Sequence, residues 1–221
     1  MSTFEIRNSL RKKRIPHKAN DTIHPVVDSI RRRAIQDEVE GAIGILLNSL
    51  CINTQADHNT RDTPRRVAKM LVCEIFRGRF EPPPEITTFP NVKNLDEMMV
   101  TGPITVRSCC SHHLCPILGE CWIGVVPGKR LAGLSKFNRI VDWFAARPQI
   151  QEELVVQIAD FIEERLAPKG LAISMRASHT CMTWRGVREH PSAIMTINVM
   201  RGVFRNKPEA RAEFLASIAQ R

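Results

Sequence analysis

The chain has 221 residues, of which 43% are hydrophobic and 25% are charged, and its formal net charge is +9. These are ordinary values for a globular protein, so neither a disordered chain nor a membrane protein is expected. No apolar run approaches the roughly 20 residues that a bilayer-spanning helix needs. The basic N-terminus lacks the apolar segment of a secretory signal, and we therefore expect a cytoplasmic protein.

The surplus of basic residues suggests an anionic partner. Basic residues run together at 11–14 and 31–33, and such runs either bind nucleic acid or form solvated surfaces. The chain has no Tyr and no recognisable nucleic-acid-binding module, so nucleic acid is not the partner that we expect. A small polyanionic substrate, such as a nucleoside triphosphate, explains the positive charge equally well.

Helical patterns fill the first part of the chain. Residues 1–24 are polar and basic, which predicts a flexible arm. From 25 to 50, apolar residues recur at spacings of three and four, as in an amphipathic helix. A second helix is predicted at 62–78, because Asp-Thr-Pro at its start supplies an N-cap and a proline that the first turn tolerates. Three prolines at 82–84 break this pattern, and we assign residues 25–95 to an N-terminal helical region.

The remaining residues, 96–221, have the pattern of a mixed domain. Runs of β-branched residues predict four strands, and amphipathic segments predict three helices. The strands are expected at 99–106, 120–126, 172–177 and 194–199, and the helices at 135–144, 148–166 and 208–219. Two strands, two helices and two strands follow one another, which favours an α+β fold with helices on one face of an antiparallel sheet.

Soft metal ligands gather in two short segments. Cys110 and His113 are three residues apart, so a turn would bring them together, and Cys181 follows a predicted strand. Thiolate and imidazole are ligands that zinc prefers, and three protein ligands leave one coordination position open for water. His112 and His113 are expected to point to opposite faces of an extended segment, so that one binds the metal while the other faces the substrate.

Two further segments carry groups suited to a nucleotide. Ser135 is expected to cap a helix whose free N–H groups and dipole favour an anion, and Lys136 and Arg139 share one face of it. An ordinary capped helix with exposed cations is the alternative. Glu152 lies in the first turn of the next predicted helix, where the helix dipole alone explains an acidic residue. Its carboxylate can also accept two hydrogen bonds from the edge of a guanine-like base.

Five ordered motifs resemble the GTP cyclohydrolase I family over about residues 25–221. They are Asp62–Met70, Cys110–Leu114, Gly133–Val141, Arg147–Glu152 and His179–Gly186. The resemblance implies the tunnelling fold, an antiparallel four-stranded sheet with two helices on one face, here in a catalytic domain at 96–221. It also implies a homo-oligomer, a toroidal decamer whose active sites lie between subunits.

The resemblance also implies roles for individual residues. The zinc (Zn²⁺) ligands are Cys110, His113 and Cys181. The catalytic residues are His179, which protonates the purine N7, His112, which assists proton transfer at the ribose, and Ser135 and Gln151. The triphosphate is handled by Ser135, Lys136, Arg139, Arg185, Arg66 and Lys69, and the guanine is held by Gln151 and Glu152.

The implied activity is a hydrolysis in tetrahydrofolate biosynthesis. The imidazole ring of GTP opens at C8, formate is released, and the product rearranges to 7,8-dihydroneopterin triphosphate. Protonation of N7 makes C8 electrophilic, a zinc-bound water is a competent nucleophile near neutral pH, and histidine can act as acid and base in the later steps.

Two segments differ from the usual pattern of the family. Ser111 stands where a Glu is usual, and residues 193–198 lack the usual run of Ser and Thr. Loss of a charge beside the metal can change the hydrogen bonding of His112. The sequence therefore leaves two alternatives open. One is a divergent paralogue that acts on a modified guanine nucleotide or stops at a ring-opened formamidopyrimidine. The other is a ring protein that binds a pterin or nucleotide without catalysis.

Overall fold

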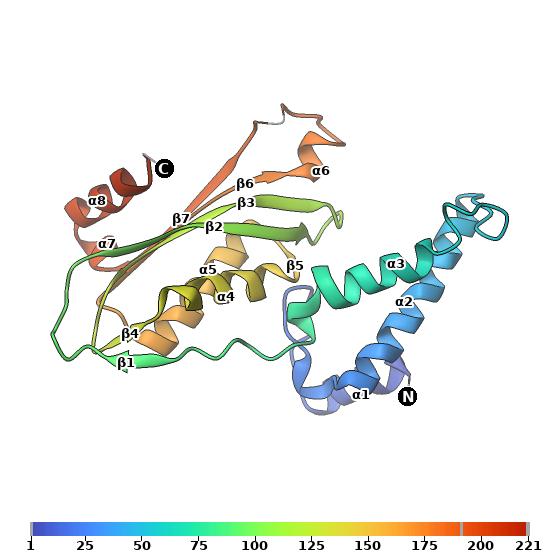
Figure 1. Cartoon of the computed structure of the whole chain (residues 1–221), viewed down its shortest axis with the longest axis horizontal. Coiled ribbons are helices and arrows are strands. Elements are labelled where there is room, and N and C mark those ends of the chain that lie inside the picture. Colours follow the sequence, from blue (N-terminus) through green and yellow to red (C-terminus); the bar gives the residue numbers. More distant parts are fainter. Residues whose placement is uncertain (1, 191, 220–221) are drawn as a thin grey trace. The chain divides into compact units, whose positions relative to one another are not determined.

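The computed structural model describes residues 2–190 and 192–219 of the chain, which fold into two compact units (Figure 1). The first unit ends at Pro82 and the second begins at Pro83. This boundary falls at the predicted proline break, whereas we had extended the helical region to residue 95. Among the described residues, no helix is both long and apolar enough to cross a bilayer.

The first unit consists of helices. They are α1 (Thr3–Lys12), the 3-10 turn η1 (His24–Val26), α2 (Ser29–Ser49), α3 (Thr63–Lys69), the π-helical η2 (Met70–Ile75) and the 3-10 turn η3 (Arg77–Arg79). The long helix begins at Ser29, later than the apolar pattern indicated, because Asp28 accepts a hydrogen bond from the Arg31 N–H at 2.8 Å and caps it.

Helix α1 replaces part of the flexible arm that the sequence predicted for residues 1–24. Ile6 and Leu10 are four residues apart, so they share one face of the helix. Both are only 3% exposed and pack in a cluster with Ile23, Val26 and Val27. The expectation of a mobile segment was wrong for this stretch, because two apolar side chains in a basic sequence are enough to fix a short helix once a partner surface exists.

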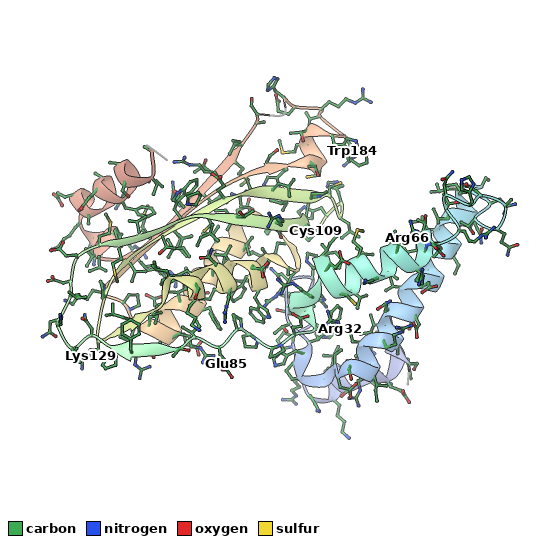
Figure 2. The ribbon with its side chains drawn as sticks, viewed as in Figure 1. Arg32, Arg66, Glu85, Cys109, Lys129 and Trp184 are labelled. Carbon is green, nitrogen blue, oxygen red and sulfur yellow. The ribbon has the colours of Figure 1, made fainter. Side chains whose placement is uncertain are left out.

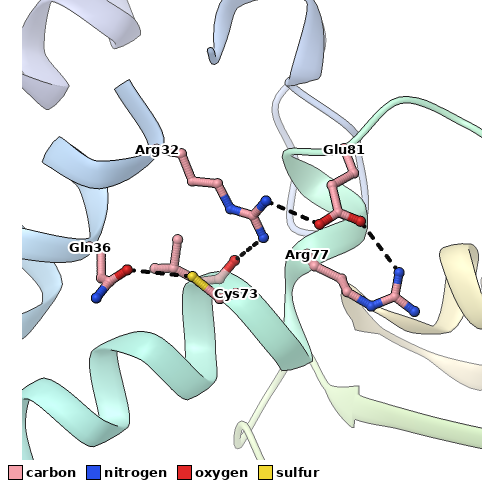
Figure 3. A network of polar contacts seen from close by, with 6 residues as sticks. Arg32, Gln36, Cys73, Arg77 and Glu81 are labelled. Carbon is pink, nitrogen blue, oxygen red and sulfur yellow. Dashed lines mark hydrogen bonds and ion pairs between the residues drawn. The ribbon is translucent and has the colours of Figure 1, made fainter. Parts of the chain in front are cut away.

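A polar network joins α2 to the segment that follows α3 (Figure 3). The Arg32 guanidinium donates to Glu81 at 3.0 Å and to the carbonyl of Val72 at 3.1 Å. The Cys73 thiol donates to Oε1 of Gln36 at 3.4 Å. These bonds hold the π-helical turn against α2, which buries few of its own side chains.

The second unit is built on an antiparallel sheet. Its long strands are β2 (Met99–Cys110), β3 (Pro116–Val126), β6 (Gly170–His179) and β7 (Met195–Gly202), in the order β2-β3-β6-β7. The short strand β5 (Pro148–Gln149) adds to the end of β2 in parallel. A separate pair joins β1 (Thr88–Pro90) to β4 (Arg130–Ala132). The four-stranded antiparallel sheet that we predicted is confirmed, with β5 as an addition.

Helices α4 (Leu134–Ala145) and α5 (Gln151–Leu166) cover one face of the sheet (Figure 1). Side chains alternate along β3, so Cys121 and Ile123 pack against these helices while Trp122 points to the opposite face. There Trp122 packs with Phe204 of α7 (Val203–Asn206) and Phe214 of α8 (Pro208–Ala219). The predicted α+β fold with two helices on one face is therefore confirmed, and the sequence had not indicated that α8 packs on the other face.

Candidate metal centre and active site

The hairpin between β2 and β3 places the first two predicted metal ligands. Strand β2 ends at Cys110, whose N–H donates to the carbonyl of Cys115 at 2.8 Å. The Leu114 N–H donates back to the carbonyl of Cys110 at 2.9 Å, and Leu114 has a left-handed backbone with a φ of 52°. The chain therefore folds back over three residues, and this turn brings His113 above Cys110. His112 lies in the turn as well, so the expectation of an extended segment was wrong here.

Strand β6 delivers the third ligand to the same place. Ile117, near the start of β3, pairs with His179 at the end of β6. The chain then enters the short helix α6 (Thr180–Thr183), and the Thr180 hydroxyl donates to the carbonyl of Pro116 at 2.8 Å. Cys181 is thereby held over the hairpin and packs near Cys110 and Ile117.

The three predicted ligands form one cluster. Three ligand atoms lie within 4.8 Å of one another: the sulfurs of Cys110 and Cys181 and a ring nitrogen of His113. A tetrahedral zinc ion with bonds of about 2.0–2.3 Å needs its ligand atoms about 3.3–3.8 Å apart, so a small closure would complete the site. Donor type and spacing both fit zinc.

The electrostatics of the cluster also favour a cation. Burial raises the pKa of the Cys181 thiol, and the neighbouring Cys110 sulfur raises it further. Two thiolates in such a place would repel each other, and a positive charge between them would offset this repulsion. A metal ion reverses this balance, because a coordinating thiol loses its proton.

A buried glutamine fixes the histidine beside the cluster. Gln151 is the first residue of α5 and is fully buried. Its amide nitrogen donates to the carbonyls of Met175 at 3.0 Å and Met195 at 3.1 Å, so its oxygen must face His179, whose Nε2 lies 2.7 Å away. An amide oxygen only accepts, so Nε2 of His179 carries the hydrogen and Nδ1 is the nitrogen left for a substrate.

Burial lowers the pKa of His179, and the carboxylate of Glu152 acts in the opposite direction. Glu152 follows Gln151 on α5, but its side chain is exposed. The two neighbouring residues can therefore serve different functions. Gln151 uses both of its N–H donors on backbone carbonyls and can act only through His179. Glu152 is free to contact a ligand, and its carboxylate is close enough to His179 to raise the pKa of the imidazole.

The predicted phosphate-binding residues of α4 lie elsewhere in the chain. Helix α4 begins with Gly133 as its N-cap, so Ser135 is the second residue of the helix and the predicted Ser135 cap was wrong. The other end of α4 is the one near the metal ligands, because the Ser108 hydroxyl donates to the carbonyl of Ala145 at 2.8 Å. At 1.5 Å per residue, Ser135 lies about 15 Å from Ala145.

The start of α4 instead lies at the far end of β2. Leu134 and Phe137 line a small cavity together with Met99 and Thr101, at the beginning of the strand that ends in Cys110. Within one chain, Lys136 and Arg139 are therefore not joined to the metal cluster. Arg185 lies in the exposed turn after α6, four residues from Cys181, while Arg66 and Lys69 belong to α3 in the first unit.

Sequence reasoning did not single out Gln149, which supports the metal turn from beneath. It is fully buried on β5, where its carbonyl accepts from the Ser111 N–H at 2.9 Å. Its side-chain amide donates to the carbonyl of Phe144 at 2.8 Å and to Gln157 at 3.0 Å. A polar residue between two apolar helical patterns was the available signal. The turn at Ser111 is therefore held by a hydrogen bond from its backbone N–H, and this bond does not depend on the identity of the side chain at position 111.

Comparison with known proteins agrees with this geometry. A sequence model described as GTP cyclohydrolase I matches residues 39–219. The chain belongs to the GTP cyclohydrolase I family. It is 37% identical over 194 residues to "GTP cyclohydrolase 1" of Aeromonas hydrophila subsp. hydrophila, an alignment that covers 87% of this chain and 88% of the relative. It is 40% identical over 181 residues to the protein of the same name from Shewanella sp. strain W3-18-1, with coverages of 81% and 84%.

A solved structure, that of the archaeosine synthase QueF-Like in the apo form, is similar at a TM-score of 0.36 and 12% identity. It covers 55% of this chain and 97% of the other. Similarity at this level does not bear on the function of the chain. Membership of the GTP cyclohydrolase I family rests on the sequence matches, and it confirms the family that the five motifs predicted.

Removal of a cluster sulfur should abolish metal binding. We expect Cys181→Ala to lower the bound zinc to less than about one tenth of the wild-type content, because two remaining ligands do not hold the ion. The measurement is elemental analysis of protein purified with zinc. Cys51→Ala is the matched control, since Cys51 is free and exposed and its variant should keep the full zinc content. Full occupancy in Cys181→Ala would contradict the assignment.

Loss of the Gln151 amide should impair His179 without emptying the metal site. Gln151→Met keeps the length and volume of the side chain but removes its hydrogen bonds. We expect kcat for the reaction proposed below to fall about 10–100-fold, as for other residues that orient a functional histidine. KM should change less and the zinc content should remain. A variant with unchanged kcat would show that the 2.7 Å contact with His179 is not used.

Proposed function

We propose that the protein is a zinc-dependent GTP cyclohydrolase. It opens the imidazole ring of GTP at C8 by hydrolysis, releases formate and forms 7,8-dihydroneopterin triphosphate. The observation that carries this proposal is the clustering of Cys110, His113 and Cys181 beside the held His179 and the exposed Glu152, in a chain of this family. We assign the catalysis to the second unit, which contains the catalytic domain expected at 96–221.

The cluster would hold the metal through two sulfurs and one imidazole. Zinc in this position supplies a Lewis acid that makes water nucleophilic near neutral pH. Cys110 is the last residue of β2 and Cys181 lies in α6, directly after β6, so the two residues are anchored next to the ends of two different strands of one sheet. This anchoring limits how far the site can relax when the ligand atoms close around an ion.

The base of the nucleotide would lie against α5 and the end of β6. Glu152 can accept two hydrogen bonds from the amino and ring N–H groups of guanine, which fixes the orientation of the purine. In its imidazolium form, which the Glu152 carboxylate favours, His179 would donate the Nδ1 proton to N7 and keep the Nε2 hydrogen that Gln151 accepts. Protonation of N7 withdraws electrons from C8 and prepares it for attack. His112, exposed in the turn with its ring centroid 6.3 Å from that of His113, would move protons at the ribose.

We propose that a second copy of the chain completes this site. Ser135, Lys136 and Arg139 lie at the far end of α4, so they would reach the triphosphate at the metal cluster of a neighbouring subunit. Arg185 would add a cation from the turn after α6, and Arg66 and Lys69 would add two more from α3. Together these groups can balance the charge of a bound triphosphate, to which Arg forms bidentate pairs.

The strand order supports assembly into a ring. Strand β7 is at one edge of the sheet, and only the two residues of β5 cover the other edge along β2. Exposed edges of this length are templates for pairing with another chain. Pairing of unlike edges forms a ring when the rotation between subunits closes, and we propose a toroidal homodecamer. On α2, large apolar side chains are also exposed, with Ile30 at 73% and Ile45 at 69%.

A cytoplasmic location, where thiols stay reduced, is consistent with the free state of all seven cysteines.

The substrate is tested by product analysis. Zinc-loaded protein incubated with GTP should release formate and give a pterin that fluoresces after oxidation, and Cys181→Ala should give neither. A panel of guanine nucleotides, read by mass spectrometry, separates the alternatives. A formamidopyrimidine without pterin would mean that the reaction stops early, and turnover of a modified nucleotide in preference to GTP would indicate a divergent substrate. An absence of turnover with bound zinc would contradict an enzymatic role.

Complementation between variants tests the shared site. Lys136→Ala/Arg139→Ala and Cys181→Ala should each lose activity when expressed alone. In co-expressed rings half of the metal clusters and half of the cation-bearing helices are intact, so about one quarter of the sites regain both. We expect activity near that fraction of the wild-type value. Mixing the same two proteins after assembly is the control, and no recovery on co-expression would place the whole site within one subunit.

A further inference from the structure

The second unit contains a cavity whose walls are rich in cations. None of the residues assigned above to the metal or the substrate lines it. It has a volume of about 670 Å³ and lies between the loop after β1, the turn from β3 to β4 and the last turn of α5. Figure 2 shows Lys129, at this turn, at the opposite end of the unit from Cys109, beside the metal cluster. A cavity of this size is in the range that small-molecule ligands occupy.

The charge of the lining is strongly unbalanced. Lys129, Arg130, Arg165 and Lys169 line the cavity against one carboxylate, that of Glu164. Four positive groups and one negative group leave a local charge of +3. Glu164 reaches Arg165 only at 3.9 Å and both side chains are at least half exposed, so this pair neutralises little.

The other cations have no acidic partner in the part of the chain that the structure describes. Within residues 2–190 and 192–219 no ion pair involves Lys129, Arg130 or Lys169. Arg165 is held in place from below, with its guanidinium carbon 5.2 Å from the centre of the Phe161 ring. Several cations around one concave surface repel each other, and the potential that they create attracts an anion of more than one charge.

The backbone beneath these side chains is fixed, so the cations converge without further ordering of the loops. Asn91 is buried, and its side-chain nitrogen donates to the carbonyls of Leu95 at 2.7 Å and Gly128 at 3.0 Å. The backbone N–H of Asn91 donates to the carbonyl of Lys129 at 2.9 Å. On the other wall, the Lys169 N–H donates to the carbonyl of Val126 at 2.9 Å. A preorganised site loses less entropy when it binds a ligand.

We propose that this cavity is a second anion site, which binds a small molecule carrying two or more linked phosphates. The residues that form it are different from those assigned to the triphosphate of the substrate. Arg130 and Arg165 offer planar groups that match phosphate oxygens, while Lys129 and Lys169 supply point charges on flexible stems. A single carboxylate or phosphate would leave most of the local charge unbalanced, which is why a polyvalent ligand fits best.

The test uses tripolyphosphate as the probe and full-length, zinc-loaded protein. Binding is measured by titration calorimetry in a Lys136→Ala/Arg139→Ala background, which removes two of the cations assigned to the triphosphate of the substrate. We expect Lys129→Ala/Lys169→Ala to weaken the remaining binding by about 10-fold or more, since charge-assisted contacts are lost. Lys12→Ala/Lys13→Ala is the matched control, because it removes the same charge from exposed positions in the first unit and should leave the affinity unchanged.

Two further measurements decide the location and the independence of the site. Tripolyphosphate should slow hydrogen exchange in residues 126–130 and 164–169. In an otherwise wild-type chain, Lys129→Ala/Lys169→Ala should leave KM for GTP unchanged. Equal weakening by the control variant, or protection confined to 135–139, would overturn the proposal. A raised KM for GTP in this variant would assign these cations to the substrate and would overturn the proposal of a separate site. If the wild-type protein does not turn over GTP, the proposed function fails, and the tripolyphosphate titration alone decides whether the second site exists.

Discussion

The antiparallel register of β2, β3 and β6 is the constraint on which the site depends. Ile117 pairs with His179, and this pairing carries Cys181 over the tip of the β2–β3 hairpin. A slip of one residue would move Cys181 by about 3.3 Å along the strand and turn His179 to the opposite face. The register is held far from the metal ligands, where Ile123 pairs with Ile173 and both are fully buried. The apolar core thus fixes the distances between polar groups that do not belong to it.

Two kinds of polar environment lie next to each other at this end of the sheet. Gln151 is buried with its hydrogen bonds made, and an unsatisfied group in its place would cost about 1–3 kcal/mol, so a single orientation of the amide is strongly preferred. The thiols of Cys110 and Cys181 are in the opposite situation. Burial and the neighbouring Cys110 sulfur raise the pKa of the Cys181 thiol, and a cation between the two sulfurs would reverse this effect. A rigid, satisfied network therefore lies next to two sulfur atoms whose proposed ligand is a metal ion.

The distribution of positive charge is the reason for proposing that a second copy of the chain completes the site. The metal cluster is at the end of β2, whereas the first turn of α4, with Lys136, is near its beginning. Helix α4 is rigid and spans the distance between them, so no local rearrangement within the subunit can join the two. Pairing along the edges of the sheet is the physical route by which a neighbouring copy would supply these cations in the proposed assembly. The cations around Lys129 belong neither to the metal cluster nor to the first turn of α4, and their mutual repulsion favours the binding of a separate anion.

Much of this protein follows from local patterns in its sequence. The helix at 208–219, the four strands of the sheet and the family were predicted from the sequence alone, because residue spacing and motif order are properties of neighbours along the chain. The candidate metal ligands Cys110, His113 and Cys181 could be grouped from the sequence because a set of thiolates and an imidazole is what zinc selects. Other features depend on contacts between distant segments. Helix α1 forms because Ile6 finds a partner surface, and Gln151 is committed to His179 because strand pairing brings them together. The sequence alone was thus enough to name the candidate residues of the site. Which of them lie together became apparent only from the folded chain, because distances across a sheet are set by register and packing rather than by spacing along the chain.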